Sequence, residues 1–284
     1  MAPLLGPSGN LGGGTVNAHD GESSPALSRN HSLAPTSHTG LLGVNVSVGT
    51  VDDLLAYVEK AVATSSLVVV AAHNLHSVYV SRTNPTFADF YDRCDVVVVD
   101  GWPILAALNR ERAAQGNPAL SSEYRFGSTD WIEQAAALSS VRRVGVIGAQ
   151  PASSEAFAKR LRSGPGAPEV LAIPGHPWTS EGAGGVYDQL RAFEPDLVLV
   201  GMGMPLQESV ITSLIDHLDH AVIAAVGGAI DQLSGAQALA PRWTGRLRIE
   251  WLWRLAADPR RLAGRYLVEP MSLARVVIKE RRAR

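Results

Sequence analysis

The chain is poor in cysteine and has no long apolar run. Cys94 is the only cysteine among 284 residues, which excludes an intrachain disulfide framework and a cysteine-based zinc site and fits a reducing compartment. No stretch approaches the roughly 20 apolar residues of a membrane-spanning helix. The N-terminus lacks the basic region and apolar stretch of a secretory signal. We therefore expect an intracellular protein that does not span a membrane.

Several phosphate- and metal-binding motifs are missing as well. The chain has no G-x-x-x-x-G-K-[ST] loop and no G-x-G-x-x-G fingerprint, so no Walker-type site is predicted. It also lacks the D-x-D motif that holds a metal–nucleotide complex in many glycosyltransferases. His73 and His76 flank Asn74 without a third ligand at metal-binding spacing. We therefore predict no metal and no cofactor.

Charge is sparse overall and concentrated at one end. Charged residues make up 18% of the chain and the net charge is −2, which does not point to nucleic acid. Residues 242–284, however, hold twelve Lys or Arg and four Asp or Glu, a net charge of +8. The rest of the chain is correspondingly acidic. This basic segment is suited to an anionic surface or a phosphate-bearing ligand.

The remaining sequence divides into three parts. Residues 1–40 are rich in Gly, Ser, Pro and Asn without periodicity and are predicted to be a disordered leader. Residues 41–241 alternate between apolar strands and helical patterns. The 46% hydrophobic content of the chain is sufficient for a sizeable core. The basic segment 242–284 forms a helical C-terminal appendage.

The alternation predicts an α/β fold with a largely parallel, Rossmann-like sheet flanked by helices. Several predicted strands are continuous apolar runs, which indicates burial on both faces. We expect a capping box of Thr50 and Asp53, Pro103 in a first helical turn, and Ser128 or Thr129 as a cap. Strands are predicted at 41–49, 66–74, 95–101, 142–150, 195–205 and 220–231, and helices at 50–64, 76–94, 103–116, 128–140, 152–164 and 207–218.

Polar and glycine residues follow these strands. In open parallel sheets, ligands bind outside the carboxyl ends of the strands. The candidate site therefore comprises Asn74, Asp100, Gly148–Gln150, Gly201–Glu208, Gly227–Gly228 and Asp231.

Asp100 ends the run Val96–Val99 and precedes Gly101. Three interpretations are open: a turn cap, a metal ligand or a general base. Taken alone, a strand that ends in Asp-Gly favours the turn. Its place at the carboxyl end of a predicted parallel strand favours the catalytic interpretation more, and so narrows the difference between it and the turn.

Two glycine-containing segments also allow two interpretations each. Gly145–Gln150 either cradles a phosphate at a helix start or forms a tight strand-to-helix turn. In Gly201–Ser209, the Gln207 amide either reads a sugar or base edge, or it is solvated while Glu208 caps the helix.

The appendage mixes tryptophan with arginine between residues 246 and 266. Such a helix suits a membrane interface, where aromatic rings lie at headgroup depth and arginine contacts phosphate. The same composition occurs in nucleic-acid binding. The simplest alternative is a helix that packs its tryptophans on the core and leaves the charges outside.

In this order, the pieces resemble the WecG/TagA/CpsF group, glycosyltransferase family 26, over roughly residues 41–266. The resemblance rests on a T-x-N-like loop, a strand ending in D-G, an R-x-x-G-x-D-like segment, and three further motifs. These read AHN at 72–74, DG at 100–101, RFGSTD at 125–130, GMPLQE at 203–208, VGGAID at 226–231 and EWLWRLAADPRRLAGRY at 250–266.

The resemblance implies an inverting transfer from a UDP-sugar to a polyprenyl-diphosphate-linked sugar at the cytoplasmic face of the membrane. The donor sugar is N-acetylmannosamine-like, its uronate or a hexose. Asp100 is implied as the general base, and the partners exclude nucleic acid. The resemblance places Asn74, Arg125, Gly203, Gln207 and Asp231 in the substrate pocket, and it assigns phosphate or membrane contacts to Arg254, Arg260, Arg261 and Arg265.

The sequence departs from the family pattern at three places. Ala72 replaces a threonine, Arg242 is shifted past Pro241, and the glycine of R-x-x-G-x-D is displaced to Gly127. Two other functions therefore stay open: a nucleotide-binding oxidoreductase or epimerase with NAD at Gly145–Gln150, and a non-catalytic membrane-associated homologue. The sequence also leaves open whether the chain is a homo-oligomer.

Overall fold

The computed structural model describes residues 33, 35–36, 43–164, 166–247 and 249–283, without the side chains of a few helical residues, Arg261 among them. The described residues all belong to one compact unit. The predicted leader, residues 1–40, lies almost wholly outside the described residues.

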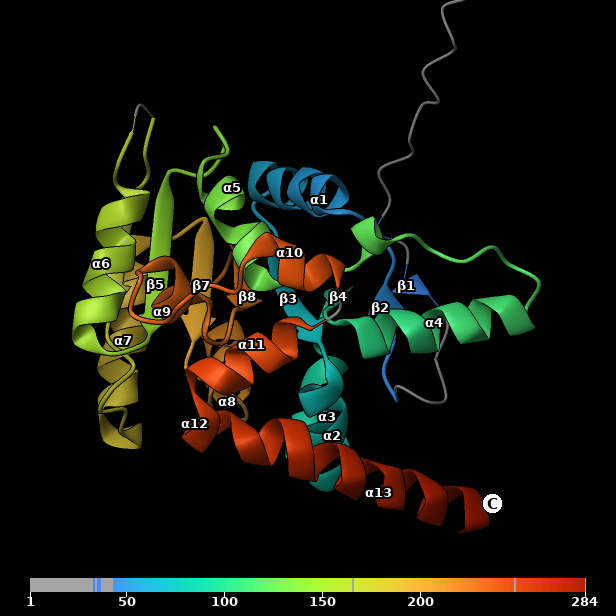
Figure 1. The fold of residues 1–284 in the computed structure, drawn as a ribbon. Coiled ribbons are helices and arrows are strands. Elements are labelled where there is room, and N and C mark those ends of the chain that lie inside the picture. The colour runs from blue at the N-terminus through green and yellow to red at the C-terminus, as the bar shows by residue number, and fades with distance from the viewer. Residues whose placement is uncertain (1–32, 34, 37–42, 165, 248, 284) are drawn as a thin grey trace, which may run out of the picture. The chain divides into compact units, whose positions relative to one another are not determined.

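A parallel sheet forms the centre of this unit (Figure 1). Its six strands lie in the order β4-β3-β8-β7-β5-β6, and every pairing is parallel. The predicted fold class, an α/β fold with a parallel Rossmann-like sheet, is confirmed. The strands are β3 Leu67–His73, β4 Val96–Val99, β5 Arg143–Gly148, β6 Glu169–Ile173, β7 Leu197–Gly201 and β8 Ala221–Ala225.

Both faces of the sheet are buried. In β3, Val69 and Ala71 belong to one hydrophobic core, while Val68 and Val70 belong to the other. Successive side chains of a strand point to opposite faces, so each continuous apolar run supplies both cores. This explains why these strands do not alternate with polar residues.

Helices pack against each of these cores. The first core includes side chains of α2 Leu75–Thr83, α3 Pro85–Tyr91, α4 Trp102–Ala114, α7 Ser180–Phe193 and α8 Leu206–Ile215. The second includes side chains of α1 Val51–Ala63, α5 Ile132–Ala136, α6 Pro151–Leu161 and α9 Ala229–Leu233.

Local sequence signals account for several helix starts. Thr50 and Asp53 form the predicted capping box of α1. Asn84 caps α3, where Pro85 begins a new helix after α2 has ended. Pro103 lies in the first turn of α4 as expected.

Other predictions are wrong in detail. In place of a strand at 41–49, the structure has a two-residue strand β2, Val46–Ser47, which pairs antiparallel with β1, Pro35–Thr36, in a separate small sheet; residues 41 and 42 lie outside the described ranges. The predicted helix 128–140 is a 3₁₀ turn, Ser128–Asp130, followed by the short α5. Neither Ser128 nor Thr129 caps α5, because both lie within the 3₁₀ turn and α5 begins only at Ile132. At the start of the turn, the Asp130 carboxylate accepts the Gly127 N–H at 2.8 Å. The strands and helices predicted from the sequence did not include β6, α7 or α9.

The C-terminal appendage, residues 242–284, follows the last strand and, where the structure describes it, consists of four short helical segments and one longer helix. These are α10 Arg242–Arg246, α11 Glu250–Ala257, α12 Pro259–Ala263, a π-helical turn Gly264–Val268, and α13 Glu269–Ala283. Helix α13 runs beside α2 (Figure 1), and its Leu273 is buried in the first core. Across the described ranges, no helix combines the length and apolar content that a bilayer crossing requires.

Candidate active site

The carboxyl ends of four neighbouring strands meet at one site. Asn74 follows β3, Asp100 follows β4, Gly203 follows β7 and Gly227 follows β8. Two cavities adjoin there, a larger one of about 350 Å³ and a smaller one of about 150 Å³. Five residues line both cavities and so mark their junction: Asn74, His76, Asp100, Arg254 and Arg265.

Asp100 is held at this junction by the backbone. Its N–H donates to the His73 carbonyl at 3.0 Å, which continues the pairing of β4 with β3. Gly101 follows with φ of 93°, a conformation that favours glycine. The chain thereby leaves the strand for α4, and the half-buried Asp100 stays beside both cavities.

The Asn74 side chain is oriented by its role as a helix cap. Its Oδ1 accepts the Ser77 N–H at 3.1 Å, so its Nδ2 is the end that donates to Asp100 Oδ2 at 3.2 Å. Burial raises the pKa of Asp100, while Arg254 and the Asn74 hydrogen bond pull it down. Asp100 is therefore a stronger proton acceptor than a solvated aspartate, yet its charged form retains partners.

The appendage supplies the cations of the junction. Arg254 on α11 and Arg265 on the π-helical turn both line both cavities and are half-buried. Arg254 Nη2 donates to Glu250 Oε1 at 2.5 Å. The larger cavity is further lined by Trp251 and Tyr266 of the appendage. Two regions far apart in the sequence thus form one site.

Arg125 also lies in the larger cavity, where it stacks on an aromatic ring. Its Cζ is 4.9 Å from the Trp102 ring centroid, within cation–π range. The Trp102 Nε1–H donates to the Gly245 carbonyl at 3.0 Å and so joins α4 to the appendage. The Arg125 Nε is buried without a hydrogen-bond partner among the described residues. An anionic ligand would satisfy it.

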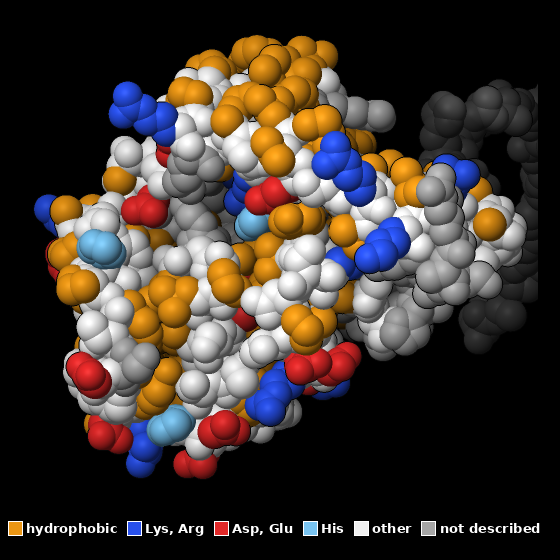
Figure 2. Space-filling model, turned by 90° about the horizontal axis from the view of Figure 1, so that it is seen from below, with side chains coloured by type: hydrophobic (Ala, Val, Ile, Leu, Met, Phe, Trp, Pro, Cys, Tyr) orange, Lys and Arg blue, Asp and Glu red, His pale blue; other side chains and the backbone are white. Residues whose placement is uncertain are grey.

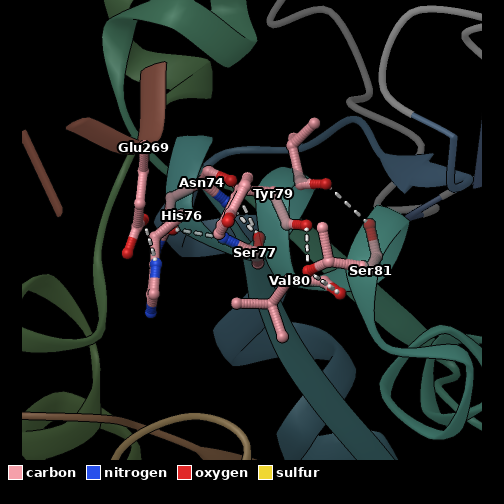
Figure 3. Close-up of polar contacts among 9 residues, drawn as sticks. Asn74, His76, Ser77, Tyr79, Val80, Ser81 and Glu269 are labelled. Atoms are coloured by element: carbon pink, nitrogen blue, oxygen red, sulfur yellow. Dashed lines mark hydrogen bonds and ion pairs between the residues drawn. The ribbon is translucent and has the colours of Figure 1, made fainter. Parts of the chain in front are cut away.

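A second contact joins the appendage to the core. His76 Nδ1, in the first turn of α2, lies 2.5 Å from Oε2 of Glu269, the first residue of α13 (Figure 3). Burial and Arg265 lower the pKa of His76, and Glu269 opposes them. Sequence reasoning missed this pair, because nothing local links residues 193 positions apart.

Gln207 and Glu208 lie at the inner side of the smaller cavity. Gln207 Oε1 accepts the Gly227 N–H at 3.0 Å, and its Nε2 donates to Glu208 Oε1 at 2.7 Å. Both residues are buried, and neither caps α8. The alternative of a solvated Gln207 and a capping Glu208 is therefore wrong. Burial raises the pKa of Glu208 to about 7.

His73 is satisfied within the core. Its Nδ1 lies 2.9 Å from Ser77 Oγ and 3.1 Å from the Tyr91 hydroxyl. Of the side chains that the structure describes, no three or more of His, Cys, Asp and Glu are grouped to hold a metal ion.

The structure separates several predicted site residues from the cavities. Asp231 accepts from Gln237 Nε2 at 3.5 Å, and Arg260 is exposed; neither is among the described residues that line these two cavities. Gly203, with φ of 77°, lines the smaller cavity. The Arg261 side chain lies outside the described residues. The roles of these residues stay predictions.

Gly148 has a structural reason to be glycine. A Cβ at this position would lie 2.2 Å from the Gly201 carbonyl oxygen, so only glycine allows β5 and β7 to approach this closely. This accounts for the glycine of the Gly145–Gln150 turn without a bound nucleotide.

The tryptophans of the appendage are exposed. The exposed fractions are 52% for Trp243, 45% for Trp251 and 39% for Trp253. The alternative in which tryptophans pack on the core is therefore wrong; it is Arg254 and Arg265 that turn inward. Nine of the eleven exposed large hydrophobic residues of the described chain belong to the appendage. Figure 2 shows hydrophobic side chains gathered at the upper edge of the view, near a hollow where basic, acidic and histidine side chains meet.

Comparison with known proteins gives two findings. The family model described as "Glycosyl transferase WecG/TagA/CpsF family" matches residues 39–284. The chain is also 23% identical over 252 residues to the "N-acetylglucosaminyldiphosphoundecaprenol N-acetyl-beta-D-mannosaminyltransferase" of Staphylococcus aureus strain NCTC 8325 / PS 47, and equally to that of strain COL. Each match covers 87% of this chain and 95% of the relative. The family model spans both the sheet and the appendage.

Proposed function

Because the chain belongs to the glycosyl transferase WecG/TagA/CpsF family, we propose that it transfers N-acetylmannosamine from its UDP-sugar to N-acetylglucosamine on a polyprenyl diphosphate. The sugar and the lipid acceptor come from the names of the curated relatives. The donor as a UDP-sugar comes from the family resemblance.

The observation that carries the proposal is the position of Asp100 between two cavities of different character. The smaller cavity is lined by glycines and polar groups at strand ends, where a sugar nucleotide binds in this kind of sheet. The larger cavity is lined by Trp102, Trp251 and Tyr266 and receives the lipid-linked acceptor. A base that serves both substrates belongs at their junction.

The reaction is a single displacement. The acceptor hydroxyl oxygen forms a bond to the anomeric carbon, and its proton passes to the Asp100 carboxylate. The bond from the anomeric carbon to the β-phosphate oxygen breaks, and its electron pair leaves with UDP. Attack opposite to the leaving group inverts the anomeric configuration.

Positive charge at the junction stabilises the departing UDP. Arg254 and Arg265 line both cavities, so they can contact a diphosphate between them. Preorganised charges of this kind stabilise a transition state because they need no reorganisation during the reaction. Arg125 adds a third cation in the larger cavity.

The exposed apolar side chains of the appendage support docking to a membrane. Leu247, Leu252 and Val268 are 63%, 49% and 55% exposed, and the surrounding segment is basic. Apolar side chains insert at the headgroup boundary while arginine and lysine attract anionic lipid. The protein is thereby attached to the cytoplasmic face of the membrane, where a lipid-linked acceptor is found.

The test is a transfer assay with the full chain. UDP-N-acetylmannosamine is incubated with N-acetylglucosaminyl-diphosphoundecaprenol, and both UDP release and the lipid product are measured. UDP-N-acetylglucosamine, UDP-glucose and the uronate donor serve as comparisons. We expect a β-linked disaccharide on the lipid. UDP release without a lipid-linked disaccharide, or an α-linked product, would refute the proposal.

A further inference from the structure

One carboxyl oxygen in the smaller cavity lacks a partner. Glu208 is 4% exposed, and its Oε1 accepts from Gln207 at 2.7 Å. Its Oε2 is buried with no hydrogen-bond partner within the described part of the chain. Nearly all buried polar atoms in folded proteins are hydrogen-bonded, so such an exception needs an explanation.

The hydrogen-bonding groups of Gln207 and Tyr91 are already committed. Both ends of the Gln207 amide are used, one by Glu208 and the other by the Gly227 N–H. Tyr91 lines the same cavity, but its hydroxyl donates to the Ala72 carbonyl at 3.2 Å. Glu208 itself lines the smaller cavity, so a ligand bound there can supply the donor that Oε2 lacks.

The charges of the cavity are separated along its length. Arg254 and Arg265 line both cavities and so lie at the junction with Asp100, whereas Glu208 lines only the smaller cavity. The pKa of Glu208 is accordingly governed by burial and by local hydrogen bonds. The end at Glu208 therefore lacks the cations present at the junction. A diphosphate is attracted to the arginine end, while a carboxyl at the other end favours a neutral group with an N–H or O–H.

We infer that Glu208 Oε2 accepts a hydrogen bond from the neutral end of the sugar nucleotide, so that the diphosphate lies toward Arg254 and Arg265. The inference rests on the proposed function. The Gln207 amide positions this carboxyl by donating from Nε2 to Glu208, and its Oε1 accepts from the N–H of Gly227. The neutral end is either the transferred sugar or the uracil, both of which carry hydrogen-bond donors.

The experiment is calorimetric titration of wild type, Glu208→Gln and a matched control, Glu181→Gln, with three ligands: UDP-N-acetylmannosamine, UDP and inorganic diphosphate. Glu181 is exposed on α7. The glutamine keeps the shape of Glu208 but places an NH₂ donor or a neutral oxygen where Oε2 was. We expect Glu208→Gln to bind UDP-N-acetylmannosamine roughly tenfold or more weakly, and the control to bind it like the wild type.

The other two ligands identify the contact. If Glu208→Gln binds only UDP-N-acetylmannosamine more weakly than the wild type does, Glu208 contacts the sugar. If it binds UDP more weakly by the same factor, Glu208 contacts the nucleoside. Either result supports the inference. Unchanged affinity for the UDP-sugar overturns it, as does tighter binding of inorganic diphosphate, which would place the phosphates beside Glu208. A wild type that binds no UDP-sugar refutes the proposed function instead. If Glu208→Gln does not fold, Glu208→Asp, which retracts the oxygens by one methylene, is measured in the same way.

Discussion

The two sides of the site are held in place by different kinds of contact. On the core side, Asn74 and Asp100 come directly after two paired strands, and Asn74 is also the N-cap of α2. On the appendage side, Arg254 and Arg265 reach the junction because short helices dock on the core. That docking includes the Trp102–Gly245 hydrogen bond, the His76–Glu269 pair and buried Leu273.

This difference separates the base from the cations. The hydrogen bonds that orient Asp100 come from Asn74 and His73 of the core, so the base is preorganised without the appendage. The arginines are in place only when the appendage is docked. Variants of each side should therefore fail in different ways.

The largest effect is expected at the base. Asp100→Asn should lower kcat by roughly 10²- to 10⁴-fold, the usual contribution of a general base, with UDP-sugar affinity largely kept. The measurement is initial-rate kinetics beside calorimetric titration. Asp188→Asn, at an exposed position on α7, is the control. Near-normal turnover in Asp100→Asn would remove this residue from the mechanism.

The second-largest effect is expected when a cation of the junction is removed. Arg254→Gln should lower kcat by roughly 10²- to 10³-fold, as for loss of one charge-stabilising donor. It should also move the acid limb of the pH–rate profile upward. Asp100 is active when ionised, activity falls as pH drops through its pKa, and Arg254 lowers that pKa. Arg191→Gln, an exposed arginine of α7, should leave the profile unchanged. If the acid limb of Arg254→Gln stayed where it is in the wild type, Arg254 would not be a determinant of the Asp100 pKa.

The burial of Glu208 should make the free energy of unfolding depend on pH. Its pKa is raised from 4.5 to about 7, so the folded state holds the proton more tightly than the unfolded state. The stabilisation of the protonated carboxyl is complete below pH 4.5 and is lost as pH rises through 7. Glu208→Gln should therefore gain about 3 kcal/mol in free energy of unfolding, relative to wild type, between pH 4 and pH 8. Urea unfolding at both values checks this; a pH-independent difference would contradict it.

Substitution of the exposed apolar side chains of the appendage should weaken only the steps that involve a membrane or a lipid-linked acceptor. The triple variant Leu247→Ser, Leu252→Ser and Val268→Ser should weaken binding to anionic vesicles by roughly tenfold or more, because each side chain loses apolar area that the membrane would bury. Transfer to an acceptor with a short, soluble chain should be unchanged. Leu239→Ser, at an exposed leucine outside the appendage, is the control. Equal vesicle binding by the triple variant would exclude these side chains as the anchor.

The smallest effect is expected at the His76–Glu269 contact. Both side chains are partly exposed, 19% and 22%, and pairs of this kind contribute about 1 kcal/mol or less. Glu269→Gln should raise hydrogen exchange in α13 and lower kcat severalfold, without a change in the exchange of β3 or β4. Glu194→Gln, which breaks the exposed pair with Arg143, is the comparison. A rise in exchange throughout the sheet would show that the pair stabilises the whole unit.

Local sequence patterns were sufficient for much of the core side. The apolar runs before Asn74 and Asp100 predicted parallel strands, and ligands of such sheets lie at the carboxyl ends. The structure places both residues, with Gly203, Gln207 and Gly227, around one smaller cavity. These positions follow from chain-local signals because a buried strand, its turn and the next helix cap are adjacent in sequence.

The appendage could not be predicted to the same degree. Its composition indicated a basic aromatic helix but not which side chains face inward. Arg254 turns to the junction and Trp253 to the outside, a choice set by contacts with α2 and α4. The burial of Glu208 was also missed, since a Glu at a helix start is ordinarily a solvated cap.

The sequence by itself therefore determined most strands of the central sheet, the starts of α1 and α4 and the acid at the end of β4, because each depends on neighbours within a few residues. Only the tertiary structure decided that β4, β3, β8 and β7 lie side by side and that Arg254, Arg265 and Glu269 complete their site. Strand order and helix docking depend on contacts between segments separated by up to 193 residues. Such contacts are selected by the packing of the whole unit and leave no local pattern in the chain.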